Sequence, residues 1–223
     1  MNVPFVFTIE EMLDHFIDEG VSPSADDVET AGCRLGRNYY PALVLDLWGE
    51  GLLEPAVAAV VVPSAWSAVE FPNRALDDDA WSLLFALAGY TVDGVPAERP
   101  EATMRLWRGA LPGHRSGWSW TDDRSLAQWF AERVHNGGKG RVWTAEVEPA
   151  RLLARLGDGI GRAGEAEYVV DARELTIRAD SLPGVLRTRC GLRRATGRKH
   201  AGQRHLTVRC RSTSRTRDSR ATG

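Results

Sequence analysis

The sequence predicts an α+β protein built from three regions: a mainly helical N-terminal region (residues 1–100), a strand-rich region (residues 101–185) and a basic tail (residues 186–223). Three observations carry this prediction. Hydrophobic residues make up 43% of the 223 residues, which is enough for a real core. Apolar residues recur at helical spacing in the first region and alternate in the second. The tail holds 12 Lys and Arg and one acid, whereas the rest of the chain holds 16 basic and 29 acidic residues.

Two helices are expected in the N-terminal region. Thr8 and Glu11 have the spacing of a capping box, so a helix should begin after Thr8. A second helix over residues 77–88 begins with three aspartates, which the positive end of the helix dipole favours, and ends before Gly89. The apolar stretch at residues 41–62 fits a helix or a buried strand equally well.

A linker and a series of strands are expected to follow. Pro and Gly at residues 93–100 predict a boundary between the first two regions. Beyond it, alternating apolar residues predict strands, while helical spacing or an initial proline predicts helices. The glycine-rich segment is expected to be a flexible loop over the functional site. The expected strands cover residues 102–107, 118–121, 141–147, 165–171 and 174–178, the expected helices cover residues 122–134 and 150–156, and the loop covers residues 157–164.

Two glutamates stand two positions apart in one of these strands. Residues i and i+2 of a strand point to the same face, so Glu165 and Glu167 should present their carboxylates together, with Tyr168 and Val170 facing a core. Two like charges this close are costly without a cationic or hydroxyl partner, which favours a functional site. The alternative is an exposed strand edge that carries solvated acids.

Two further motifs precede the glutamates. Arg108 follows Leu-Trp and precedes Gly109; its planar guanidinium suits bidentate contact with a phosphate, and the glycine would let a ligand approach the backbone. Ser119 and Thr121 share one face of a strand, where two hydroxyls can orient a carboxylate. Taken singly, these motifs also fit a surface arginine in a turn and ordinary β-propensity.

Together, the three motifs resemble the arginine–serine–glutamate branch of the ADP-ribosyltransferase superfamily, over about residues 104–170. The resemblance implies a split β-sheet core that the N-terminal helices complete, NAD as the substrate and no metal. It implies that Arg108 holds the NAD phosphates or ribose, that Ser119 positions the catalytic glutamate, and that Thr121 supports the nicotinamide pocket. Gly109 would belong to the same NAD site.

The resemblance also implies the roles of the glutamates. Glu167 would bind a hydroxyl of the nicotinamide ribose and stabilise the sugar cation, and Glu165 would assist the acceptor, which in this branch implies arginine. Because a nicotinamide ring binds well in a dry aromatic pocket, Trp118, Trp120 or Phe130 is expected to stack on it. Trp120 departs from the family, which often has a small residue there.

Three functions agree with these motifs. The first is a mono-ADP-ribosyltransferase acting on an unknown protein acceptor. The second is an NAD glycohydrolase on the same scaffold, serving as a toxin or defence factor. The third is a non-catalytic, nucleic-acid-associated protein that works through its tail. The tail is too poor in apolar residues to fold alone, so we expect it to be disordered and to contact nucleic acid non-specifically, with strong salt dependence.

Membrane, targeting and cysteine patterns narrow the cellular compartment and the kinds of cysteine site to expect. No apolar stretch is long enough for a membrane span, and the N-terminus lacks the pattern of a signal peptide. A cytoplasmic protein is therefore expected, although these patterns do not exclude leaderless secretion. Cys33, Cys190 and Cys210 are odd in number and widely spaced, which indicates neither a disulfide framework nor a zinc site.

Overall fold

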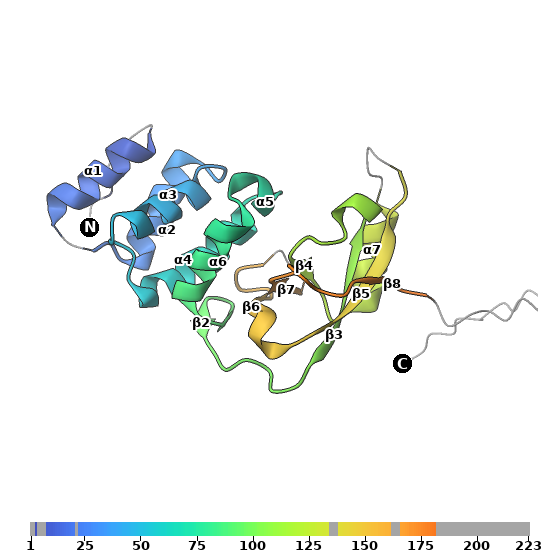
Figure 1. Cartoon of the computed structure of the whole chain (residues 1–223). Helices are drawn as coiled ribbons and strands as arrows, with labels where there is room; N and C mark the ends of the chain where they lie inside the picture. Colours follow the sequence, from blue (N-terminus) through green and yellow to red (C-terminus); the bar gives the residue numbers. More distant parts are fainter. Residues whose placement is uncertain (1–2, 4–7, 21, 134–137, 162–165, 182–223) are drawn as a thin grey trace, which may run out of the picture. The chain divides into compact units, whose positions relative to one another are not determined.

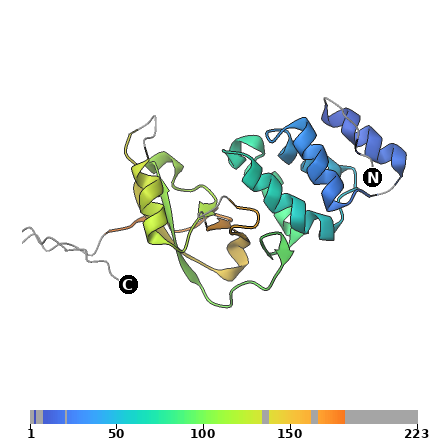
Figure 2. The ribbon, with the colours of Figure 1, turned by 180° about the vertical axis from the view of Figure 1, so that it is seen from behind.

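The computed structural model describes residues 3, 8–20, 22–133, 138–161 and 166–181 of the chain (Figures 1 and 2). The chain divides into two compact units, Met1–Leu182 and Pro183–Gly223. Helices and strands are both present among the described residues, which confirms the predicted α+β class. The basic tail lies outside these residues, so its disorder stays a prediction. No helix in the described part of the chain has both the length and the apolar character needed to cross a bilayer.

Six helices form the N-terminal region. The capping box at the start of the first is confirmed: Oγ1 of Thr8 accepts from the backbone N–H of Glu11, and the carboxylate of Glu11 accepts from the N–H of Thr8, both at 3.2 Å. The stretch that fitted a helix or a strand forms two helices. The elements are α1 (Ile9–Glu19), α2 (Ala25–Leu35), α3 (Tyr40–Gly49), α4 (Pro55–Ala68), α5 (Pro72–Ala75) and α6 (Asp78–Ala88).

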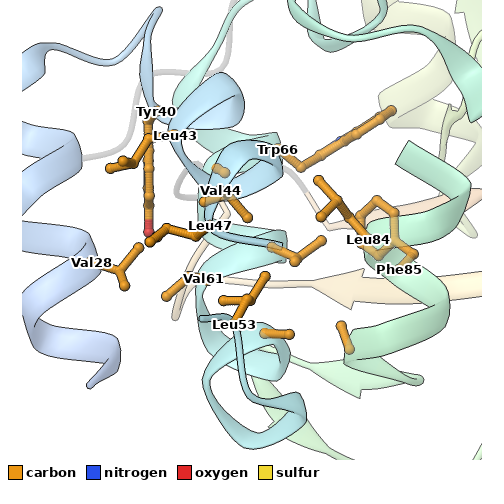
Figure 3. Packing of buried hydrophobic residues seen from close by; sticks show 14 of the residues in the cluster. Val28, Tyr40, Leu43, Val44, Leu47, Leu53, Val61, Trp66, Leu84 and Phe85 are labelled. Carbon is orange, nitrogen blue, oxygen red and sulfur yellow. The ribbon is translucent and has the colours of Figure 1, made fainter. Parts of the chain in front are cut away.

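Helix α4 is central to the core of this region. It contacts α2, α3 and α6, and it is apolar on nearly every side, as a helix surrounded by other elements should be. Figure 3 shows Val61 and Trp66 of this helix among Leu47 of α3 and Leu84 and Phe85 of α6. This packing fixes where Trp66 projects.

The strands form two sheets. The first has the order β2-β1-β6-β7-β4 and the second the order β3-β5-β8; only β1 and β6 are parallel. Trp107 and Thr121 exchange backbone hydrogen bonds of 2.8 Å and so join the two sheets. The strands are β1 (Thr91–Val92), β2 (Val95–Pro96), β3 (Met104–Ala110), β4 (Ser119–Trp120), β5 (Arg141–Val147), β6 (Leu152–Leu156), β7 (Glu167–Val170) and β8 (Arg178–Ala179).

Three buried clusters connect these layers. The first combines the N-terminal helices with Val169 and one face of the five-stranded sheet. The second combines residues of both sheets and contains Tyr168 and Val170, so the prediction that these two side chains face a core is confirmed. The third lies between α7 (Arg124–Glu132) and the strands β3 and β5, which α7 covers on one side (Figures 1 and 2).

Two boundary predictions are wrong because a local signal was outweighed by sheet pairing. The first part of the linker expected at residues 93–100 is instead the turn, at Asp93 and Gly94 with φ of 50° and 76°, and the second strand of a β1–β2 hairpin that belongs to the first sheet. The helix expected after Pro149 is a single 3₁₀ turn, Pro149–Arg151, followed by β6. Alternate residues of β6 are buried, which is the period of a strand.

Three further expectations need correction. The strand expected from Glu174 begins only at Arg178, because Glu174 has φ of 64°. The glycine-rich loop is anchored over its described part, since Oδ1 of Asp93 accepts from the backbone N–H groups of Gly157 at 2.6 Å and Ile160 at 3.4 Å. The helix expected over residues 122–134 covers Arg124–Glu132, and its buried residues are Ala127 and Ala131.

Candidate functional site

Sheet pairing brings two of the three motifs together. In the antiparallel pair β4–β7, Ser119 lies opposite Val169 and Trp120 lies opposite Tyr168. Because opposite residues share a face and the face repeats every two residues, Ser119 and Glu167 lie on the same face as diagonal neighbours. The hydroxyl motif and the glutamate motif are therefore adjacent in space, as the sequence predicts.

Arg108 joins the first motif to the second through the main chain. Its Nη1 donates to the backbone oxygen of Ser119 at 2.6 Å, and its Nε donates to that of His114 at 3.2 Å. Gly117 lies against the guanidinium, because a Cβ there would be 2.3 Å from Nη2. The hydrogen bonds described for Arg108 thus go to one carbonyl oxygen of the loop between β3 and β4 and to one of β4 itself, and its contact with NAD stays a prediction.

The charges of Arg108 and Glu167 interact. Burial lowers the pKa of Arg108 to about 10, and the negative charge of Glu167 acts in the opposite direction and raises it. The guanidinium stays protonated at neutral pH. The first and third motifs are therefore coupled electrostatically, although they come from different sheets.

Glu167 also has a partner that the sequence analysis missed. It is the first residue of β7 and is half-buried, and its Oε1 accepts a hydrogen bond of 2.9 Å from Nε1 of Trp66 in α4. The two residues stand 101 positions apart, so no motif spacing links them. The only available signal was the unusual number of tryptophans, eight in all.

An aromatic cluster holds Trp66 in place. The ring of Trp118 stacks on it with centroids 6.0 Å apart and planes at 22°. Trp81 and Phe85 of α6 meet it edge-on at 5.0 and 5.8 Å. Trp66 is only 1% exposed. Rotation of this indole would require several packed rings to move, so the position of its N–H group is fixed.

Two of the three aromatic residues expected to bind nicotinamide are buried packing residues in this structure. Trp118 and Trp120 are 1% and 2% exposed, and Nε1 of Trp120 donates to the backbone oxygen of Gly117 at 2.8 Å. Protein therefore covers these two rings, which corrects the expectation that either of them stacks on nicotinamide. Phe130 is half-buried and meets the ring of Trp129 at 4.9 Å on α7, and its contact with nicotinamide stays a prediction.

Gly109 and Thr121 serve the packing of α7. A Cβ at Gly109 would lie 2.0 Å from the backbone oxygen of Ala127, so the helix occupies the space expected for a ligand. Thr121 is 6% exposed, and its Oγ1 accepts from the backbone N–H of Asp123 at 3.1 Å. Asp123 in turn caps α7. The described contacts of these two residues are with α7 and its cap, and their contact with NAD stays a prediction.

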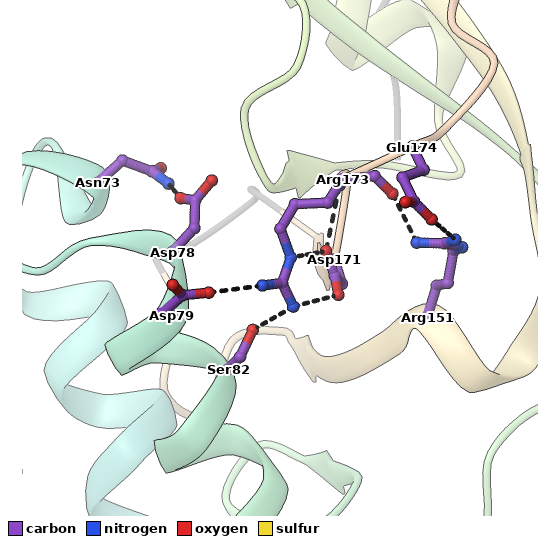
Figure 4. A network of polar contacts seen from close by, with 8 residues as sticks. All are labelled: Asn73, Asp78, Asp79, Ser82, Arg151, Asp171, Arg173 and Glu174. Atoms are coloured by element: carbon purple, nitrogen blue, oxygen red, sulfur yellow. Dashed lines mark hydrogen bonds and ion pairs between the residues drawn. The ribbon is translucent and has the colours of Figure 1, made fainter.

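A network around Arg173 fastens the far end of β7 to the helices (Figure 4). Its Nε and Nη2 donate to the two oxygens of Asp171 at 2.9 and 2.8 Å, and its Nη1 and Nη2 reach Asp79 and Ser82 of α6 at 2.9 and 2.6 Å. These hydrogen bonds lower the pKa of Asp171 and raise that of Arg173. Both ends of β7 are therefore tied to the N-terminal helices.

Two cavities lie near this region. One of about 390 Å³ adjoins Arg173, whose guanidinium lies 5.8 Å from the ring of Trp118, and the other measures about 460 Å³. Neither is lined by Arg108, Ser119 or Glu167. Residues that line the first are Arg115, Ser116, Ala172 and Leu175, and residues that line the second are Arg105, Thr144, Glu146 and Thr176.

Glu165 falls outside the described residues, so its position relative to Glu167 stays a prediction. In the described part of the chain, no group of three or more His, Cys, Asp or Glu side chains could hold a metal ion. No protein-family model matches the chain, and the comparisons with curated proteins and with solved structures found no match. The function therefore has to be argued from the arrangement of Arg108, Ser119 and Glu167.

Proposed function

We propose that the chain is an NAD-dependent mono-ADP-ribosyltransferase that transfers ADP-ribose to a protein acceptor. One observation supports this above the others: Arg108, Ser119 and Glu167 come from three separate strands and interact pairwise. Arg108 donates to the backbone oxygen of Ser119, Ser119 is a diagonal neighbour of Glu167 in the β4–β7 pair, and the charge of Glu167 acts on Arg108. Their order along the chain is that of the enzymes that the sequence resembles.

Glu167 would act on the glycosidic bond of NAD. The bond between the ribose carbon C1 and the nicotinamide nitrogen breaks, and its electron pair leaves with nicotinamide, which becomes neutral. The ribose carbon becomes cationic, and a fixed carboxylate beside it stabilises that charge. The acceptor then forms a bond to C1 and loses a proton. Glu167 is half-buried, so water would screen its charge less than on an open surface.

Arg108 and Ser119 would shape the site around this carboxylate. The two carbonyl contacts of Arg108 hold the β3–β4 loop, and the contact with the Ser119 oxygen fixes the strand next to Glu167. Ser119 shares a face with Glu167, where its hydroxyl can orient the carboxylate or meet the ribose. Arg108 thus supports the site through the backbone as well as through its charge.

Incubation with NAD labelled in its adenosine part tests the proposal. Release of nicotinamide together with labelling of a protein acceptor is the expected result. Glu167→Gln should lower the rate of release by about 10²–10³-fold, the usual effect of removing one such group. The matched control is Glu146→Gln, which removes an exposed carboxylate of β5 that pairs with Arg105 and should leave the rate unchanged.

The outcomes separate the competing functions. A correctly folded Glu167→Gln variant with the wild-type rate would remove the carboxylate from the mechanism. Release of nicotinamide without any labelled protein would make the chain an NAD glycohydrolase. An inert chain that binds nucleic acid only when residues 186–223 are present would favour the non-catalytic function.

A further inference from the structure

The hydrogen bond between Trp66 and Glu167 crosses from the helical region to the sheet. The donor is the indole N–H of a helix residue, and the acceptor is the first residue of β7. An indole N–H can only donate, so it needs an acceptor wherever it is buried. The carboxylate of Glu167 supplies that acceptor, and one of its two oxygens is thereby engaged.

The donor is rigid. Trp66 is fully packed by Trp81, Phe85 and Trp118, whose rings lie between 5.0 and 6.0 Å from its own. The sheet side is also fixed, because the Arg173 network ties the segment after β7 to α6. A hydrogen bond between two rigid bodies selects one rotamer of the glutamate at little further cost in entropy.

We propose that Trp66 is the positioning residue for the catalytic carboxylate, so that the N-terminal helical region forms part of the active site. The inference rests on the proposed function of Glu167. The indole holds Oε1 and thereby fixes the rotamer of the whole carboxylate. Its ring system also keeps water away from one side of the carboxylate, which strengthens the electrostatic attraction between the carboxylate and the sugar cation.

Two changes at position 66 test the role. Trp66→Phe removes the N–H group and part of the ring. Site-specific incorporation of benzothienylalanine at position 66 replaces the N–H group by sulfur in a ring system of nearly the same shape, so this variant keeps the packing even if the phenylalanine variant folds poorly. Both should lower kcat by about tenfold or more, because misplacement of a catalytic group on the order of 1 Å can cost about 10²-fold. KM for NAD should change little.

Trp143→Phe is the matched control. Trp143 of β5 is a buried tryptophan outside this aromatic cluster, and its Nε1 donates at 3.0 Å to the backbone oxygen of Ala110 rather than to Glu167. Its replacement should cost similar stability in a thermal melt and leave kcat unchanged. In a Glu167→Gln background, the benzothienylalanine change should add no further loss, because the two groups act as one unit.

Different experimental results would refute the inference and the proposed function. If the wild type turns over NAD and the benzothienylalanine variant keeps the wild-type kcat, then Trp66 does not position Glu167. The same conclusion follows if Trp143→Phe lowers kcat as much as the changes at position 66, since the effect would then be one of general packing. If the wild type releases no nicotinamide, the proposed function fails, and the inference fails with it.

Discussion

The guanidinium of Arg108 holds the main chain of Ser119 through a 2.6 Å hydrogen bond from Nη1. Two motifs that stand 11 residues apart are therefore connected through a backbone oxygen, and a second carbonyl, that of His114, completes the contact. This relationship makes the geometry of the site depend on the shape of the arginine head group as well as on its charge.

The first prediction follows from this contact. Arg108→Lys keeps the charge but cannot donate to both carbonyls with one fixed geometry. We expect the free energy of unfolding to fall by about 1 kcal/mol, because the part-buried oxygen of Ser119 and the exposed oxygen of His114 lose a fixed donor. NAD affinity should fall as well. Denaturant unfolding and a binding titration measure the two effects, and a variant with unchanged stability would mean that the carbonyl contacts are dispensable.

The second prediction concerns pH and the Arg173 network. Hydrogen bonds from Arg173 lower the pKa of Asp171 below its ordinary value of 3.8. A lowered carboxyl pKa contributes stability that is present above pH 3.8 and is lost as the pH falls through the folded-state pKa. Asp171→Asn should therefore destabilise the protein at pH 7 by about 1 kcal/mol, after allowance for partial solvent screening.

The same variant should lose less stability than the wild type as the pH falls below 3.8. Urea unfolding at a series of pH values measures both curves. Parallel curves for the two proteins would show that the Asp171 carboxylate contributes nothing to acid sensitivity.

The third prediction compares two glycines. Gly109→Ala would place a Cβ 2.0 Å from the backbone oxygen of Ala127, which a packed helix cannot avoid without moving. Gly113→Ala makes the same substitution where nothing lies within 4 Å of the new Cβ. We expect the first to cost about 3 kcal/mol or more and the second to stay near wild type in thermal melts. Equal melting temperatures would refute the close packing of α7 on β3.

The fourth prediction concerns the tail. The unit Met1–Leu182 contains every described helix and strand, so a chain ending at Leu182 should keep its melting temperature and its turnover of NAD. Binding of the full chain to duplex DNA should weaken steeply with salt and vanish on truncation. A truncated chain that unfolds would place a core element in residues 183–223.

The fifth prediction concerns Glu165. If β7 continues toward Glu165, its carboxylate lies about 7 Å from that of Glu167 along the strand. A base there can take the proton from an attacking guanidinium, which is a poor nucleophile while protonated. Glu165→Ala should therefore abolish labelling of arginine-containing acceptors and spare much of the NAD hydrolysis. Parallel loss of both activities would make Glu165 a structural neighbour of Glu167.

Local signals predicted part of the fold well. Helix α6 begins and ends where its sequence predicts, because Asp77 caps its first turn and Gly89 ends it. Both effects act within a few residues. Strand β6 was predicted as a helix because Pro149 is a common first residue of a helix, whereas its true structure depends on β1 and β7, which are distant in sequence.

The candidate site was also predictable only in part. The neighbourhood of Ser119 and Glu167 was predictable from motifs, but the donor Trp66 was not, since helical packing decides which of eight tryptophans meets the sheet. On α7, no signal in the sequence indicated which residues face the strands. The close approach of the helix to Gly109 requires small buried residues, and Ala127 supplies one.

The stacked pair of Trp66 and Trp118 gives the protein an optical signature of its own. Indoles 5.0 to 6.0 Å apart couple electronically when they absorb light, so we expect the ultraviolet circular dichroism of this cluster to contain paired bands of opposite sign. Trp66 belongs to α4, and Trp118 immediately precedes β4. Loss of the contribution of Trp118 to these bands would report, without any label, that the helix and the sheet have separated.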